Sequence, residues 1–226
     1  MTTPTPADKR LSTPVKATLI AIAVVIALVL AAIVYVNVTR PAPVAPDDGA
    51  LPGTRSNSHI LDDAGPDAPT LVEFLDFECE ACGAFYPYIE EIREQYAGEI
   101  NYVVRYFPIS SHFNSMNAAI AVEAASQQSR FEEMYARMFE TQIEWGEGSS
   151  SEADRFRGYA EELGLDMDAY DQAVADPATQ ERVEEDFLAG QEMGVTGTPT
   201  FFLDGEKLEL NSLTDLTDAL DRAIAD

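Results

Sequence analysis

Both cysteines of the chain lie in one stretch, LDFECEACGAFYP, at residues 75–87. A pair spaced C-x-x-C can be half of a zinc site, a structural staple or a redox centre. Zinc would need two further ligands, and the two histidines, His59 and His112, are not at ligand spacing to each other. A static bridge between Cys79 and Cys82 would restrict the unfolded chain little, because the loop it closes is very short. The spacing therefore favours a redox pair that needs no metal and no cofactor.

The residues on either side place the pair at a junction between a strand and a helix. Residues 70–77, TLVEFLDF, are rich in strand formers, and apolar residues recur at helical spacing over 85–92. Cys79 would then begin the helix and Cys82 would follow one turn later on the same side. The free N–H groups and the dipole of the helix favour a thiolate at Cys79. We therefore expect Cys79 to be the exposed nucleophile and Cys82 the resolving thiol.

The rest of the chain supplies further strands and a final helix. Residues 100–109, INYVVRYFPI, read as a second strand. Residues 200–203 and 207–210 flank the turn Asp204-Gly205 and predict a hairpin. Ser212 has the character of an N-cap for a last amphipathic helix.

Between these strand-rich parts the pattern is helical, from about residue 112 to residue 194. Its aromatic and methionine stripes recur at helical spacing and are interpreted as core positions. Gly164 would follow the end of one helix and Asp166 would cap the next. A strand and helix unit, a helical block, then a hairpin and a helix predict an α/β fold, a thioredoxin-type sheet interrupted by a helical insertion.

The N-terminal part predicts a membrane anchor. Residues 17–36 form a run of 20 without a charge, which as a helix would be roughly 30 Å long and could cross a bilayer. Three basic residues within 1–16 indicate a cytoplasmic tail by the positive-inside rule. Residues 37–56 read as a linker and 57–226 as an extracytoplasmic domain of a single-pass membrane protein. A cleaved signal peptide is the alternative, although its apolar region usually has only about 7–15 residues.

The charge balance limits the partners. The chain has 40 acidic and 14 basic residues, with a formal net charge of −26. Nucleic acid and anionic lipid surfaces are therefore poor partners. A solvated acidic surface that keeps an exported domain soluble explains the charge, and a high-salt habitat is the alternative. The sequence predicts no oligomeric state.

Two separated motifs carry a family resemblance. VEFLDFECEACGAFYP at 72–87 and GVTGTPTFFLDG at 194–205 resemble the DsbA-like thiol–disulfide oxidoreductases of the thioredoxin superfamily, in the membrane-tethered form of actinobacterial and other Gram-positive envelopes. The resemblance runs over about residues 57–226. It includes Glu73 before the cysteine pair and Pro87 within the helix after it.

The resemblance assigns roles to residues outside the pair. Glu73 would lie beneath Cys82 and exchange a proton with it, which fits the cost of burying an acid that has no function or partner. The alternative is that Glu73 lies on a wet face of its strand. In the family the proline matching Pro199 is cis and lies against the disulfide, and the residue before it, here Thr198, offers its backbone to the substrate.

The two residues between the cysteines, Glu80 and Ala81, would contact the substrate. They also depart from the strongly oxidising members, which carry a histidine beside the resolving cysteine. Glu78 adds another acid next to Cys79, and nearby negative charge disfavours a thiolate. We therefore expect a less acidic Cys79 and a weaker oxidant. Thr198 resembles the isomerase branch too, which leaves the redox direction open.

The resemblance implies an enzyme that introduces disulfides into exported cysteine-containing proteins. A quinone-linked thiol oxidase in the membrane would reoxidise the pair. A reductase or isomerase fed by a membrane electron donor is one alternative. A thioredoxin-fold module that only binds other proteins is another, although such a module would not need Glu73, Pro87 and Pro199 together.

Overall fold

The computed structural model describes residue 49 and residues 51–225. The predicted cytoplasmic tail, the predicted transmembrane helix at 17–36 and most of the predicted linker lie outside the described residues. Within residues 51–225, no helix is both long enough and apolar enough to cross a membrane.

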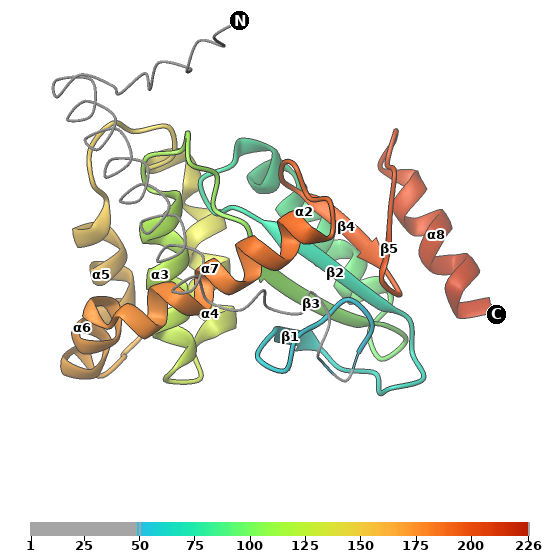
Figure 1. Ribbon diagram of the computed structural model, residues 1–226, viewed down its shortest axis with the longest axis horizontal. Coiled ribbons are helices and arrows are strands. Elements are labelled where there is room, and N and C mark those ends of the chain that lie inside the picture. The colour runs from blue at the N-terminus through green and yellow to red at the C-terminus, as the bar shows by residue number, and fades with distance from the viewer. Residues whose placement is uncertain (1–48, 50, 226) are drawn as a thin grey trace, which may run out of the picture. The chain divides into compact units, whose positions relative to one another are not determined.

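The core of the domain is a mixed five-stranded sheet (Figure 1). Its strands are β1 (His59–Asp62), β2 (Thr70–Leu75), β3 (Asn101–Tyr106), β4 (Thr200–Leu203) and β5 (Glu206–Lys207). Their order is β1-β3-β2-β4-β5, and β2 and β3 run parallel while every other pair is antiparallel. Every residue of β2 and β3 is buried, because both strands have neighbours on each side and cover on both faces.

Helices follow the strands and fill the segment between β3 and β4. They are α2 (Glu80–Gln95), α3 (Ser115–Ser126), α4 (Phe131–Glu140), α5 (Ala153–Glu162), α6 (Met167–Ala175), α7 (Pro177–Glu192) and α8 (Thr214–Ala225), with a short 3-10 helix η1 (Gln142–Glu144). Figure 1 shows α3 to α6 gathered at one end of the domain and α8 at the other. The predicted α/β thioredoxin fold with a helical insertion is confirmed.

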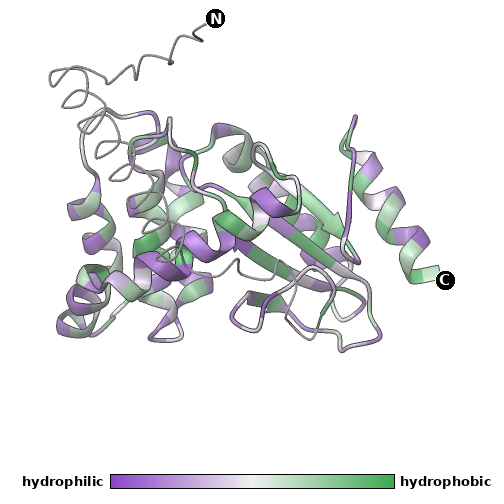
Figure 2. Cartoon of the chain, in the orientation of Figure 1, coloured by the Kyte–Doolittle hydropathy of each residue, from purple (hydrophilic) through white to green (hydrophobic). Residues whose placement is uncertain are grey.

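The two faces of the sheet bury separate apolar layers. Leu71 and Tyr102 point into the larger layer, which also takes in residues of α2, α8 and the insertion. Val72, Phe74 and Val103 point the other way, into a smaller layer that Phe187 and Met193 of α7 and its end help to close. Figure 2 shows the central strands as mostly hydrophobic between helices of mixed character. Since side chains alternate along a strand, residue 73 faces the same side as Leu71, beneath α2.

Local signals fix several helix ends as expected. The Asp166 carboxylate accepts a hydrogen bond of 3.0 Å from the amide of Ala169 and caps α6. Asp176 caps α7, whose first residue is Pro177. Gly164 follows the end of α5 with φ of +73°, a conformation that favours glycine.

The end of the hairpin and the start of the last helix differ from the sequence prediction. Residues 207–210 do not form a strand, because β5 ends at Lys207 and only one further backbone bond follows, from Leu208 to β4. The last helix begins at Thr214 and Ser212 precedes it by two residues. Asp215 accepts hydrogen bonds from the Ser212 amide and hydroxyl, so the two residues close the turn that enters the helix.

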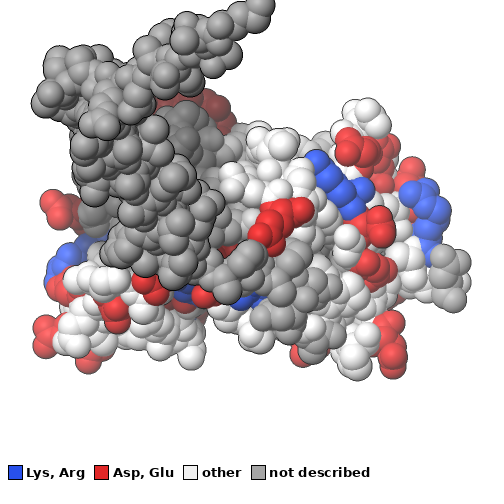
Figure 3. Space-filling view, in the orientation of Figure 1, with Lys and Arg blue, Asp and Glu red and all other residues white. Residues whose placement is uncertain are grey.

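One arginine joins three elements around the active-site helix. Arg93 of α2 donates to Asp62 of β1, Glu90 of α2 and Glu132 of α4 at 2.6, 3.0 and 2.7 Å. This network holds α2 against the edge strand and the insertion. Elsewhere on the surface seen in Figure 3, acidic side chains are widespread and basic ones are fewer.

Candidate active site

The two cysteines occupy the predicted junction. Cys79 is the N-cap of α2 with an extended backbone, and Cys82 lies in the first turn of that helix. Both thiols are free, and the exposed fractions are 8 % for Cys79 and 1 % for Cys82. Cys79 is therefore the more accessible thiol, but it is largely buried and not openly exposed as expected.

The surroundings of Cys79 favour its thiolate. A hydrogen bond with Cys82 is the largest influence that lowers the pKa of Cys79 to about 5, against burial, which raises it. The Thr198 side chain and the amides of Cys82 and Ala81 also lower this pKa. In the thiol form Cys79 Sγ donates to the Thr198 carbonyl at 3.4 Å. The buried Thr198 hydroxyl has no hydrogen-bond partner among the described residues, so it can donate to the thiolate.

Cys82 has the opposite character. Burial, the hydrogen bond that it donates to Cys79 and the charges of Glu73 and Cys79 raise the pKa of Cys82 well above its ordinary value. Cys82 therefore remains a thiol at pH values where Cys79 is a thiolate. The pair consists of one ionised sulfur and one protonated donor beside it.

Glu73 lies in the middle of β2 with 2 % of its surface exposed. Every residue of β2 is buried, so the alternative of a wet strand face is wrong. Burial raises the pKa of Glu73 to about 7, although the hydroxyl of Tyr102 donates a hydrogen bond to its carboxylate and lowers the pKa. The charge of Glu73 is one of the influences that raise the pKa of Cys82. Its role in proton transfer stays a prediction.

The loop between α7 and β4 is distant from the cysteines in sequence but contacts Cys79 in the fold. The Thr198–Pro199 peptide bond is cis, as the resemblance implied. The Thr200 hydroxyl donates to the Gly197 carbonyl at 2.7 Å and closes this turn. The loop thereby presents the Thr198 carbonyl to Cys79, 119 positions away in sequence.

The two acids near Cys79 differ in exposure. Glu80 and Ala81 are exposed in the first turn of α2, where an incoming polypeptide could contact them. Glu78 is 2 % exposed, and its carboxylate accepts a hydrogen bond from the amide of Asn114. Burial raises the pKa of Glu78. Hydrogen bonds are the main influences that lower the pKa of Cys79, and its lower acidity relative to the strongly oxidising members stays a prediction.

Three contacts of the site were not foreseen. Tyr102 is the partner of Glu73, and Nδ1 of His112 lies 2.7 Å from the Asp76 carboxylate. Gln142 of η1 donates through Nε2 to the Cys79 carbonyl and to the Phe77 carbonyl, both at 2.8 Å. Tyr102 could have been suspected from the alternation of its strand. Gln142 has no signal in the sequence around it.

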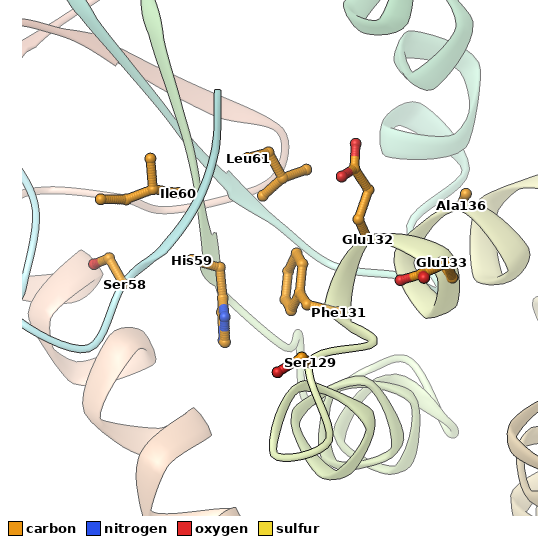
Figure 4. A pocket seen from close by; sticks show the side chains of 9 residues that line it. All are labelled: Ser58, His59, Ile60, Leu61, Ser129, Phe131, Glu132, Glu133 and Ala136. Carbon is orange, nitrogen blue, oxygen red and sulfur yellow. The ribbon is translucent and has the colours of Figure 1, made fainter. Parts of the chain in front are cut away.

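A cavity of about 780 Å³ between β1 and α4 lies apart from this chemistry (Figure 4). His59 and Phe131 stack in its wall with ring centroids 3.9 Å apart, and His59 Nε2 lies 2.8 Å from a Glu123 oxygen. None of the predicted site residues lines the cavity. His59 is thus packed against Phe131, and Trp145 is buried in the core. In residues 51–225, no three His, Cys, Asp or Glu side chains are grouped to hold a metal ion.

Comparison with known families and curated proteins adds two findings. The family model described as thioredoxin matches residues 65–222. The chain is 36 % identical over 178 residues to the Na⁺/H⁺ antiporter NhaA 1 of Mycobacterium sp. (strain KMS), covering 76 % of this chain and 26 % of that protein. It is also 36 % identical over 167 residues to the antiporter NhaA 3 of Salinispora tropica, covering 73 % and 23 %. The chain thus spans about a quarter of the length of the curated relatives that it matches.

Solved structures share the fold. A thioredoxin-like oxidoreductase from Silicibacter pomeroyi is 25 % identical with a TM-score of 0.61, covering 75 % of this chain and 94 % of that one. Wolbachia pipientis α-DsbA1 is 23 % identical with a TM-score of 0.65, covering 76 % and 93 %. Oxidised BdbD from Bacillus subtilis is 16 % identical with a TM-score of 0.66, covering 82 % and 98 %.

Proposed function

The chain belongs to the thioredoxin family, and we propose on that basis that it is a DsbA-like enzyme that oxidises thiols of exported proteins. The observation that carries the proposal is the opposite ionisation of the two sulfurs. Surrounding groups lower the pKa of Cys79 to about 5 and raise the pKa of Cys82. Thiol–disulfide exchange needs one sulfur that reacts with the partner and a second that resolves the mixed disulfide. A module that only binds proteins has no use for this difference.

The proposed reaction starts from the oxidised pair. A substrate thiolate attacks Cys79 Sγ, the Cys79–Cys82 bond breaks, and Cys82 leaves with the electron pair. Glu73, neutral over part of the physiological pH range, gives Cys82 a proton. A second substrate thiolate then attacks the substrate sulfur of the mixed disulfide and releases Cys79 as a thiolate. Two electrons pass from the substrate dithiol to the pair, and Glu73 regains its proton from solvent.

The acidity of Cys79 supports the oxidising direction. Stabilising the thiolate stabilises the reduced pair, and an exchange enzyme with a stabilised reduced form is the stronger oxidant. The reductase and isomerase alternatives predict a low reduction potential instead. Equilibration of the full chain with glutathione discriminates between them, since about 30 mV corresponds to about 1.4 kcal/mol for a two-electron couple.

We also propose that the enzyme works outside the membrane, anchored by residues 17–36 in a single pass with a cytoplasmic N-terminus. The uncharged run in the sequence and the basic residues before it support this placement. The similarity to proteins named as membrane antiporters is consistent with a domain held at a membrane. The substrates are then exported proteins with cysteines, and a quinone-linked thiol oxidase in the membrane reoxidises Cys79 and Cys82.

Trapping of the mixed disulfide tests this function. In a Cys82→Ser variant the thiolate of Cys79 can still attack a disulfide of a partner protein, whose S–S bond breaks so that one partner sulfur leaves as a thiolate. The Cys82 thiol that would attack the resulting Cys79–partner disulfide is absent. We expect covalent adducts with exported cysteine-containing proteins, seen as slow bands on non-reducing gels and dissolved by a reducing agent.

The matched control is Cys79→Ser, which removes the attacking sulfur and should give no adducts. A soluble Cys82→Ser protein with a reactive Cys79 that traps nothing would contradict the oxidoreductase. The remaining function would then be a thioredoxin-fold module that binds other proteins.

A further inference from the structure

The loop between β3 and α3 brings His112 to the turn that holds Cys79. His112 Nδ1 lies 2.7 Å from Oδ2 of Asp76, the residue that follows β2. The main-chain carbonyl of Asp76 accepts a hydrogen bond of 3.1 Å from the amide of Cys79. One residue therefore joins the imidazole ring to the backbone of the attacking cysteine.

Backbone hydrogen bonds fix the Asp76 carboxylate in the position where it contacts the imidazole ring of His112. Its side chain is fully buried, Oδ1 accepts from the amide of Glu78 at 2.9 Å, and Oδ2 accepts from the amide of Ile109 at 3.0 Å. Two backbone amides thus fix the position of the Asp76 carboxylate. His112, whose side chain is 28 % exposed, thus faces a fixed negative charge.

The other ionisable groups around His112 come from four parts of the chain. They are Asp76 after β2, Glu78 and Cys79 before α2, Glu147 after η1, and Glu184 of α7, which lines a cavity of about 530 Å³ together with His112. All of them are neutral or negative, so they favour a protonated ring. Burial alone lowers the pKa of His112, but the hydrogen bond and charge of Asp76 and the charges of Cys79 and Glu78 raise it above the ordinary value.

We propose that His112, held as an imidazolium by Asp76, is a positioning residue that stabilises the thiolate of Cys79. The proposal deepens the function proposed above and rests on it for its purpose, although the electrostatic contact exists without a substrate. Coupling between two sites is reciprocal. Since a thiolate at Cys79 favours the protonated ring, the protonated ring favours the thiolate to the same degree.

The chain contains a matched control, because it has two histidines. His59 also pairs with a carboxylate, at 2.8 Å from Glu123, and it stacks on Phe131. It lines the cavity of Figure 4, in which no cysteine takes part. Loss of either histidine removes one imidazole–carboxylate pair, but only His112 is linked through its carboxylate partner to the backbone of Cys79.

The first experiment follows the histidines by NMR in the full-length chain, purified in a mild detergent, without any substitution. In the reduced protein the thiolate of Cys79 is present above about pH 5, and in the oxidised protein it is absent. We expect the pKa of His112 to fall on oxidation, by about half a unit or more if the effective dielectric constant is near 20. The pKa of His59 should be the same in both states. An unchanged pKa at His112, or an equal shift at both rings, would overturn the proposal.

The second experiment measures the thiolate itself by its ultraviolet absorbance as a function of pH. His112→Gln should raise the midpoint of Cys79 by a similar half unit or more, and His59→Gln should leave it unchanged. His112→Lys keeps a positive charge and should restore the midpoint towards that of the wild type. A midpoint that rises as much in His112→Lys as in His112→Gln would show that packing of the ring matters and not its charge.

These outcomes are separate from those of the trapping experiment, because neither readout involves a partner protein. Trapped adducts without the histidine effects would refute the role of His112 and leave the exchange function intact. The histidine effects without adducts would leave His112 coupled to a thiolate that serves some other reaction.

Discussion

At the scale of single residues, Glu73 gives the folded protein its own pH dependence. The folded state raises the pKa of Glu73 to about 7 from an ordinary value of 4.5, mainly through burial. The folded protein therefore keeps a proton that the unfolded chain releases between about pH 4.5 and 7. The free energy of unfolding falls as the pH rises through this window, and the full destabilisation by ionised Glu73 is present above about pH 7.

A Glu73→Gln substitution should remove this destabilisation. Glutamine has no charge, and its side-chain oxygen can still accept the hydrogen bond from Tyr102. In the reduced protein we expect the free energy of unfolding to match that of the wild type near pH 4 and to exceed it by about 3 kcal/mol at pH 8. Urea denaturation across this pH range checks the prediction. A difference in the free energy of unfolding between the two proteins that stays the same at every pH would contradict it.

The same substitution should affect the two steps of the exchange reaction differently. The resolving step at Cys82 should slow, because its proton donor and acceptor is lost. Alkylation of Cys79 in the reduced protein should change much less. Single-turnover kinetics with a model peptide measures both steps, and equal slowing of the two would assign Glu73 a structural role only.

At the scale of elements, η1 connects the helical insertion to the first turn of α2. Gln142 donates to two carbonyls at the start of that turn, and its Oε1 lies where a side chain at residue 83 would go. A Cβ on Gly83 would meet Oε1 at 1.9 Å. The contact between the insertion and the active-site helix thus depends on a glycine that a helix interior would otherwise disfavour.

This contact predicts that the effect of Gly83→Ala on stability depends on whether Gln142 is present. Gly83→Ala alone should give no stabilisation or a net loss, because it displaces Gln142 from two hydrogen bonds, although alanine favours the helix by about 1 kcal/mol. In a Gln142→Ala background the same change should stabilise the protein by about 1 kcal/mol. The cycle, measured by chemical denaturation, should therefore give a coupling of about 1–2 kcal/mol.

Gln128 offers the control for this cycle, because it also makes two side-chain bonds to one backbone segment, the N–H and carbonyl of Asp166. Gln128→Ala should lower stability without any coupling to Gly83→Ala. An additive cycle between Gly83 and Gln142 would show that the insertion and α2 are not joined in this way.

Elements with a strong local pattern could be predicted from the sequence, and those defined by distant partners could not. The buried strand at Thr70–Leu75 and the helix after Cys79 follow from apolar periodicity and a cap position. By contrast β1, HILD, has only four residues with no alternation in burial, and it forms because its edge pairs with β3. Likewise the bonds of Gln142 span 63 and 65 positions, and nothing in the neighbouring sequence indicates them.

At the scale of the whole molecule, the distribution of charge bears on the proposed location of the domain. The chain carries a net charge of −26, yet three of its 14 basic residues fall within the first 16 positions. Basic residues before an apolar run hold that end in the cytoplasm. We propose that this asymmetry sets the orientation of the chain and leaves the acidic domain outside.

Reporter fusions test this orientation. A reporter joined after Asp226 that is active only outside the cytoplasm, such as a secreted phosphatase, should give activity, and a reporter active only inside should give none. Replacing Lys9, Arg10 and Lys16 with acidic residues should reduce the bias. Activity of the cytoplasmic reporter in the unchanged chain would overturn the proposed location.

The pairing of β2 with β4 also has a consequence for the order of synthesis. The central strand β2 and both cysteines are made early, but β4 and the Thr198 carbonyl that meets Cys79 come from the last 30 residues. A growing chain therefore carries two thiols before it can assemble the groups that tune them. Contacts between distant segments form late. The nascent protein thus behaves as an ordinary cysteine-containing polypeptide, and the groups proposed to tune its cysteines for exchange come together only after residues 198–203 have been made.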